Sequence, residues 1–175
     1  MLNSLPYIPI DEELDLNTAM LALLLSKLSK NKKGNFVLDL EKIQIFLYLI
    51  KNPSKISKIL RLADKPSPPL DKKLTHTIES MSSNVDMLFN RQKIKVLIRR
   101  LAALGFLKCE GTAESNSIRF HLSDSGAAFA NTLESEVSDG NYISSLIEII
   151  SKLEPLQSQP TTKLNSWLNT LFKGN

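Results

Sequence analysis

The sequence predicts a mainly α-helical protein with one small β-hairpin, and two patterns lead to this prediction. Apolar residues recur at the three- to four-residue spacing of amphipathic helices in most parts of the 175-residue chain. Between residues 105 and 123, this spacing gives way to two short strand-like runs that flank the small and polar stretch "GTAESN". We therefore expect helices on both sides of a single hairpin.

The composition is typical of a globular protein in a reducing compartment. Hydrophobic residues make up 42% of the chain and charged residues 23%. The single cysteine, Cys109, cannot form an internal disulfide, and residues 1–15 lack the basic and apolar regions of a signal peptide. The most apolar stretches, "MLALLL" and "IQIFLYLI", are too short to span a bilayer. We expect a soluble cytoplasmic protein.

The net charge of +4 is unevenly distributed along the chain. Residues 21–100 carry 17 Lys and Arg against 6 Asp and Glu, whereas residues 1–20 carry four acids and no base. Residues 101–140 are acidic again. A basic middle region favours a polyanionic partner, although a solvated protein face often presents the same pattern.

Two helices are expected near the N-terminus. Asn17 or Thr18 can cap a helix that runs to Lys30, and Asp39 can cap a second helix that ends at about Lys51. Both helices carry apolar residues on more than one side. Such helices are buried against several neighbours or against a partner.

Asparagine and proline residues mark the next boundaries. Asn52 can cap a third helix with Pro53 at its first position, and the prolines of "DKPSPPLD" exclude a helix interior. We interpret this proline-rich stretch as a hinge. The predicted organisation is an N-terminal helical part (1–63), the hinge (64–71), a second domain (72–136) and C-terminal docking helices (137–175).

The second domain begins with two predicted helices. The first, over residues 71–83, is polar, and the second, "RQKIKVLIRRLAAL", is capped by Asn90 and ends in a left-handed conformation at Gly105. The buried side of the second helix is predicted to consist of Ile94, Leu97, Ile98, Leu101 and Leu104.

The hairpin and the helix after it complete the element order of a winged helix. The strands are "FLKCE" and "SIRFHL". Alternation in the second strand predicts that Ile118, Phe120 and Leu122 are packed and that Arg119 and His121 are solvated. Ser123 can cap the next helix, and Gly126 permits a close backbone approach there.

Two amphipathic helices are predicted at the C-terminal end, separated by a linker between Pro155 and Pro160. The last helix, "TTKLNSWLNTLF", places its large apolar residues on one stripe. We regard this stripe as a candidate docking surface, with packing into the protein's own core as the alternative. Its residues are Trp167, Leu168, Leu171 and Phe172.

Catalytic and cofactor-binding patterns are missing from the sequence. The glycines are scattered, the two histidines stand far apart, and Cys109 is explained better as a packing thiol than as a nucleophile. In "LDLEK", Asp39, Glu41 and Lys42 resemble a nuclease half-site, but a helix there would fan them apart, so a cap and two solvated charges explain them better. We expect no enzyme, cofactor or metal.

The basic helix is the better candidate for a functional site. Its predicted outward residues are Arg91, Lys93, Lys95, Arg99 and Arg100. A winged helix places this helix in the DNA major groove, but an acidic partner or plain solvation would also explain the charges. The wing tip carries Glu110 and Glu114 without a cation, which suits a minor-groove probe poorly.

Two resemblances follow from these residues. "IRRLAALGFL" and "RFHLSDSGAAF" resemble winged helices of the MarR type. "LNTAMLALLLSKLSK", "LDLEKIQIFLYLIKNPSKI" and "LFNRQKIKVLIRRLAALGFL" together resemble the middle component of bacterial ABC-three-component, or Lamassu-type, anti-phage and anti-plasmid defence systems, with Asn52-Pro53 as the most recognisable point.

The second resemblance implies a non-catalytic adaptor subunit. Its implied partners are an SMC-like ATPase and a nuclease effector, with DNA contacted through the complex and no membrane involved. The alternative is a free-standing winged-helix transcription regulator.

Overall fold

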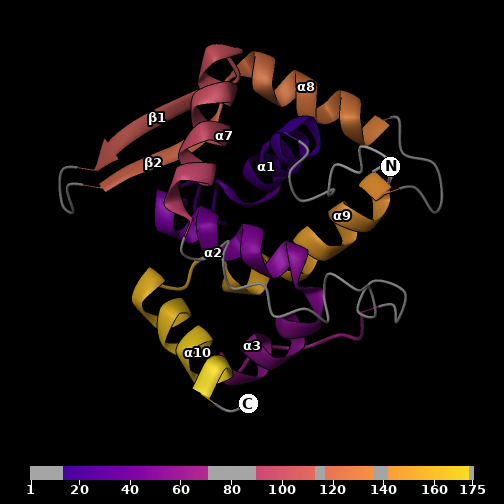
Figure 1. The fold of residues 1–175 in the computed structure, drawn as a ribbon, viewed down its shortest axis with the longest axis vertical. Coiled ribbons are helices and arrows are strands. Elements are labelled where there is room, and N and C mark those ends of the chain that lie inside the picture. Colours follow the sequence, from indigo (N-terminus) through magenta and orange to yellow (C-terminus); the bar gives the residue numbers. More distant parts are fainter. Residues whose placement is uncertain (1–13, 71–89, 113–116, 136–141, 174–175) are drawn as a thin grey trace, which may run out of the picture.

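The computed structural model of the protein describes residues 14–70, 90–112, 117–135 and 142–173, and it is mainly helical with one hairpin, as predicted (Figure 1). The helices are α1 (Leu14–Leu28), α2 (Leu40–Lys51), α3 (Ile56–Leu62), α7 (Arg91–Ala103), α8 (Asp124–Ser135), α9 (Tyr142–Lys152) and α10 (Thr161–Lys173). The short 3-10 turns η2 (Pro53–Lys55) and η3 (Glu154–Leu156) and the strands β1 (Leu107–Thr112) and β2 (Ser117–Leu122) complete these segments.

Helix α1 is the centre of the fold. It contacts α2, α7, α8, α9 and β2, and every residue from Leu21 to Leu25 is fully buried. The expectation of a helix with more than one apolar side is therefore confirmed. The predicted cap is wrong, because the helix already begins at Leu14 and the Thr18 hydroxyl donates to the Leu14 carbonyl at 2.6 Å within the helix.

Helix α2 forms a second buried layer. Asp39 caps it as predicted, since its carboxylate accepts a hydrogen bond from the Lys42 backbone N–H at 2.8 Å. Pro53 occupies the start of η2 as predicted, but Asn52 makes no side-chain cap. Instead, the Asn52 amide is buried and donates to the Tyr48 carbonyl at 2.9 Å, which closes the end of α2.

One hydrophobic core joins the described segments. It contains buried side chains from α1, α2, α3, α7, α9 and α10, and Leu70 of the predicted hinge packs against it. Residues 65–70 of the proline-rich stretch have no regular secondary structure. The domain boundaries themselves stay a prediction.

Helix α7 begins at Arg91 as predicted and ends at Ala103, one residue before the predicted end. The Asn90 side chain accepts from the Lys93 N–H at 3.2 Å, and Gly105 ends the helix with φ of +73°. Leu104, however, is 50% exposed, so its predicted burial is wrong. The last helical residue is Ala103, and Leu104 therefore leaves the buried side as the chain turns at Gly105.

The hairpin pairs antiparallel with Cys109 opposite Phe120, and it is tied to the rest of the fold by a hydrogen bond from the Phe120 N–H to the Leu38 carbonyl at 2.8 Å. Phe120 and Leu122 pack against the core as predicted, but the other predictions for this strand are wrong. Ile118 is 53% exposed, because it pairs with Gly111 near the far end of the hairpin, away from the pair Leu107 and Leu122. Arg119 and His121 are instead partly buried.

Helix α8 begins as predicted. The Ser123 hydroxyl accepts from the Gly126 N–H at 3.1 Å, and a Cβ atom at Gly126 would lie 2.2 Å from the Phe106 carbonyl oxygen. The close backbone approach is thus confirmed. The predicted helix over residues 71–83 lies outside the described residues, so the winged-helix assignment stays a prediction.

The two C-terminal helices are present where they were expected. The segment between Pro155 and Pro160 is a compact turn, in which Leu156 and Gln157 are buried, rather than an open linker. Helix α10 packs against α2 and α3 (Figure 1).

Candidate functional site

The outer side of α7 is the first candidate surface. Ile94, Leu97 and Leu101 face the core, and Arg91, Lys93, Lys95 and Arg99 are exposed. Because successive residues turn by about 100° around a helix axis, Arg91 and Lys95 lie on one flank and Lys93 on the other, with Arg99 between them. The predicted basic residues are therefore outward, but they cover a wide arc rather than one flat patch.

Arg100 differs from the other four cations. Its guanidinium pairs with the Asp15 carboxylate at the start of α1, and one third of the Arg100 side chain is exposed. This contact holds α7 against α1. Arg100 is thus paired with another part of the chain, a contact that no sequence pattern predicts.

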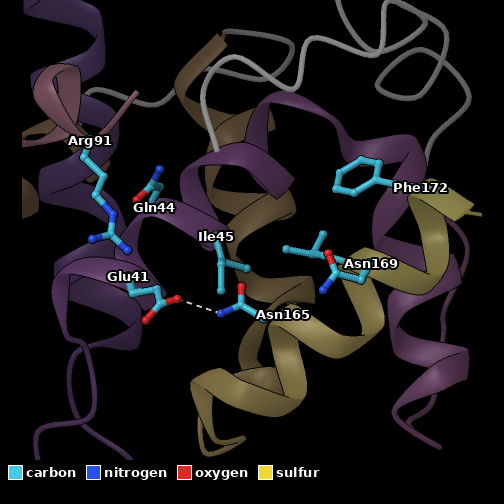
Figure 2. Close-up of a pocket in the computed structure, with 8 residues that line it drawn as sticks. Glu41, Gln44, Ile45, Arg91, Asn165, Asn169 and Phe172 are labelled. Atoms are coloured by element: carbon cyan, nitrogen blue, oxygen red, sulfur yellow. Dashed lines mark hydrogen bonds between the residues drawn. The ribbon is translucent and has the colours of Figure 1, made fainter. Parts of the chain in front are cut away.

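A pocket of about 230 Å³ lies between α2, the start of α7 and α10 (Figure 2). Arg91 extends from α7 over α2, and Asn169 and Phe172 project from α10. Two of the lining residues are joined by a hydrogen bond from the Asn165 amide to the Glu41 carboxylate at 2.6 Å. The pocket therefore joins the basic helix and the C-terminal helix in one surface that offers charged, amide and apolar groups.

The C-terminal apolar stripe is largely used inside the protein. Leu168 is only 2% exposed and belongs to the core, whereas Trp167, Leu171 and Phe172 are partly buried against it. The Phe172 ring meets the Tyr48 ring edge-on at 6.0 Å. In this structure Leu168 is not accessible to a partner, and the docking role of the other three stays a prediction.

A polar cluster at the start of α2 was not anticipated from the sequence. The Asp39 carboxylate pairs with Arg119 of β2 at 2.6 Å and accepts from the Thr161 hydroxyl of α10 at 3.3 Å. Asp39 thus connects α2, the hairpin and α10. The sequence did not predict this contact, because the alternation of the strand places Arg119 on the solvated side.

Lys42 is buried beside this cluster. It is 5% exposed, and its ammonium group donates to the Gln157 carbonyl at 3.1 Å. Burial lowers the pKa of Lys42 to about 8, with nearby Asp39 opposing and Arg119 adding to the effect. The expectation that Lys42 is solvated is wrong.

The nuclease half-site that "LDLEK" resembles is not assembled. The side chain of Glu41 points away from Asp39 and Lys42, towards Asn165, so these three residues do not converge as a nuclease site requires.

The hairpin carries a second unexpected contact. The His121 ring stacks on Phe36 with centroids 3.8 Å apart, and it lies 3.7 Å from the Glu110 carboxylate.

Other predictions for the hairpin have different outcomes. Cys109 is exposed, so its predicted packing role is wrong. Glu114, at the predicted acidic wing tip, lies outside the described residues. Glu110 remains more than half exposed.

Within the described segments, no three His, Cys, Asp or Glu side chains gather closely enough to hold a metal ion. Over the same segments, each helix falls short of the length or apolar character that a bilayer crossing demands.

The chain matches a known protein family. Residues 28–166 match the family model described as "ABC-three component (ABC-3C) system Middle Component 4". The matched range runs from the end of α1 into α10 and includes the Asp39 cluster and the whole of α7. Searches of curated proteins and of solved structures found no match for this chain.

Proposed function

The chain belongs to the Middle Component 4 family of ABC-three-component systems, and from this premise we propose that it is a non-catalytic adaptor subunit of a Lamassu-type defence complex in the cytoplasm. A component of such a system has partner subunits. The finer proposal is that these partners are an SMC-like ATPase and a nuclease effector, and that the adaptor links the sensing of foreign DNA to control of the nuclease.

The single observation that carries the proposal is the family match over residues 28–166. The geometry is consistent with it. The polar groups that resemble a nuclease half-site are used to join α2, the hairpin and α10, and the described segments leave α7 exposed on its outer side. Some charged residues therefore join elements within the chain, while those on the outer side of α7 stay exposed. This arrangement suits a protein that holds other proteins in position.

Partner contacts are proposed for the α10 surface and for α7. Trp167 and Leu171 are partly exposed beside the pocket that Arg91 and Phe172 line. Aromatic residues and arginine are the side chains that most often dominate binding energy at protein interfaces. On α7, Lys95 and Arg99 would face an acidic surface or DNA that the complex holds.

The test is assembly of the complex from its own operon. The chain should co-purify in fixed stoichiometry with an SMC-like ATPase and a nuclease encoded by the adjacent genes. Trp167→Ala should weaken this assembly at least about tenfold, as interface aromatics commonly do. The matched control is Lys58→Ala at an exposed position of α3, which should leave assembly unchanged.

The alternative function is a free-standing winged-helix regulator. It is favoured by one observation, an exposed basic helix directly followed by a hairpin. This alternative predicts that the isolated chain binds one operator sequence tightly and that Arg99→Ala/Arg100→Ala abolishes binding. Such binding, together with no co-purifying subunits, would overturn the adaptor proposal.

A further inference from the structure

A hollow lined with lysines lies apart from α7 and from the pocket beside α10. It has a volume of about 560 Å³ and is formed by the turn after α1, the end of α3 and the turn after η3. We call it the lysine hollow and define it by Asn31, Lys32, Lys33, Lys65, Ser158 and Gln159. We propose that the lysine hollow binds the phosphate backbone of a nucleic acid without reading its sequence.

The charge of the hollow favours an anion. Lys32, Lys33 and Lys65 line it together with one carboxylate, Glu154. Lys32 lies 4.0 Å from Glu154, but both side chains are mostly exposed, at 91% and 57%, so solvent weakens this pair. Among the described residues, Lys33 and Lys65 have no carboxylate within ion-pair distance. The hollow therefore keeps an excess of positive charge for a ligand.

The lysines project from ordered backbone. The Asn31 side chain accepts hydrogen bonds from the Lys33 and Asn35 N–H groups, both at 3.0 Å, which closes the turn that carries Lys32 and Lys33. Gly34 completes this turn with φ of +83°. On the opposite side, the Lys65 N–H donates to the Leu60 carbonyl at 2.9 Å after the end of α3. Because the backbone is fixed, binding has to order only the side chains.

A buried cation lies beneath the hollow. Gln157 lines it and is itself 5% exposed. The Gln157 side-chain amide donates to the Leu28 and Lys30 carbonyls at 2.8 and 2.5 Å, and the Gln157 backbone carbonyl accepts from the ammonium group of Lys42. A charge held inside the protein is screened less by salt than a surface charge. Lys42 therefore adds attraction for an anion in the hollow.

The lining favours nucleic acid over an acidic protein. Pro155 is the one apolar residue that contributes to it, and aromatic or aliphatic anchors of the kind that dominate protein interfaces are lacking in the described lining. Lysine, asparagine, serine and glutamine side chains are those that contact phosphates and sugars. Interfaces with nucleic acids are also more polar and more basic than those with proteins.

The proposal can be tested with the full chain and a fluorescein-labelled duplex of scrambled sequence, by fluorescence anisotropy at several KCl concentrations. The test variant is Lys32→Gln/Lys33→Gln/Lys65→Gln. The matched control, Lys58→Gln/Lys163→Gln/Lys173→Gln, removes the same charge from exposed lysines elsewhere. The test variant should weaken binding about tenfold or more and reduce the slope of log K against log[KCl] by about 2 to 3, whereas the control should change affinity by less than about threefold.

Other outcomes would overturn the proposal. These are equal weakening by both variants, loss of binding only in Arg91→Gln/Lys95→Gln/Arg99→Gln, no binding by the unaltered chain at low salt, or binding of poly-glutamate as tight as that of DNA. Thermal melts verify that the variants are folded, and Lys32→Arg/Lys33→Arg/Lys65→Arg should retain affinity. The result is independent of co-purification with partner subunits, so this proposal and the adaptor proposal can fail separately.

Discussion

At the scale of single residues, Asp39 has two structural roles that can be separated. It caps α2 through the Lys42 N–H and pairs with Arg119 at 2.6 Å, with about one fifth of each side chain exposed. Asp39→Ser should keep the cap and lose the ion pair, whereas Asp39→Ala should lose both. We expect Asp39→Ala to lower the free energy of unfolding by about 1 kcal/mol more than Asp39→Ser does, which is the usual value of such a cap.

Urea unfolding of these two variants, alone and combined with Arg119→Gln, checks this prediction. If the ion pair contributes, the losses from Asp39→Ser and Arg119→Gln should be less than additive, because each substitution removes the same contact. Full additivity would show that Asp39 and Arg119 do not stabilise each other.

Lys42 should give the protein a distinctive dependence of stability on pH. Its pKa is lowered from 10.5 in the unfolded chain to about 8 in the folded one, mainly by burial. Between these values the unfolded chain binds more protons, so the free energy of unfolding should rise as pH increases from about 8 to 10. Above about 10, Tyr48 acts in the opposite direction, since burial raises the pKa of its phenol and folding then keeps that proton.

Chemical denaturation at a series of pH values between 7 and 10 measures this effect. Lys42→Met removes the titrating group, and its stability should lose the rise between pH 8 and 10. Lys58→Met, at an exposed position, is the control and should retain it. An unchanged pH profile in Lys42→Met would contradict the assignment of the rise to Lys42.

At the scale of elements, the joint between the hairpin and α8 depends on a glycine. A Cβ atom on Gly126 would lie 2.2 Å from the Phe106 carbonyl oxygen, which is backbone and cannot rotate away. Gly126→Ala should therefore destabilise the protein by about 2 kcal/mol or more, at the upper part of the usual range for overpacking. Gly111→Ala in β1 meets nothing within 4 Å and should change stability by less than about 1 kcal/mol. Thermal melts of the two variants provide the comparison.

The sequence predicted elements better than it predicted contacts between them. Local signals located α2, α7, the hairpin and α8, because Asp39, Asn90, Gly105 and Ser123 act on backbone groups only a few residues away. The contact of Arg119 with Asp39 joins residues 80 positions apart, and no local pattern specifies it. The candidate surfaces were likewise predicted only as faces of single helices, because no local pattern specifies which other elements lie beside them.

At the scale of the whole molecule, the shared core determines how the protein unfolds. The core contains side chains of α1 and α2 together with Leu97 of α7, Ile150 of α9 and Leu164 and Leu168 of α10. Parts that bury their apolar surfaces against one another lose stability together when one of them opens. The predicted hinge would separate these parts along the chain, but their burial links them energetically.

We therefore expect a single cooperative unfolding transition. The protein has one tryptophan, Trp167 in α10, so its fluorescence reports on the C-terminal helices, whereas far-ultraviolet circular dichroism reports on all helices. The two signals should give the same transition in urea. Leu168 is 2% exposed, so Leu168→Ala should lower the free energy of unfolding by about 2 to 5 kcal/mol and move both midpoints together. A fluorescence transition at lower urea than the dichroism transition would mean that the C-terminal helices unfold by themselves. In that case α10 would be free to leave the core, and its whole apolar stripe, Leu168 included, would become accessible to a partner subunit.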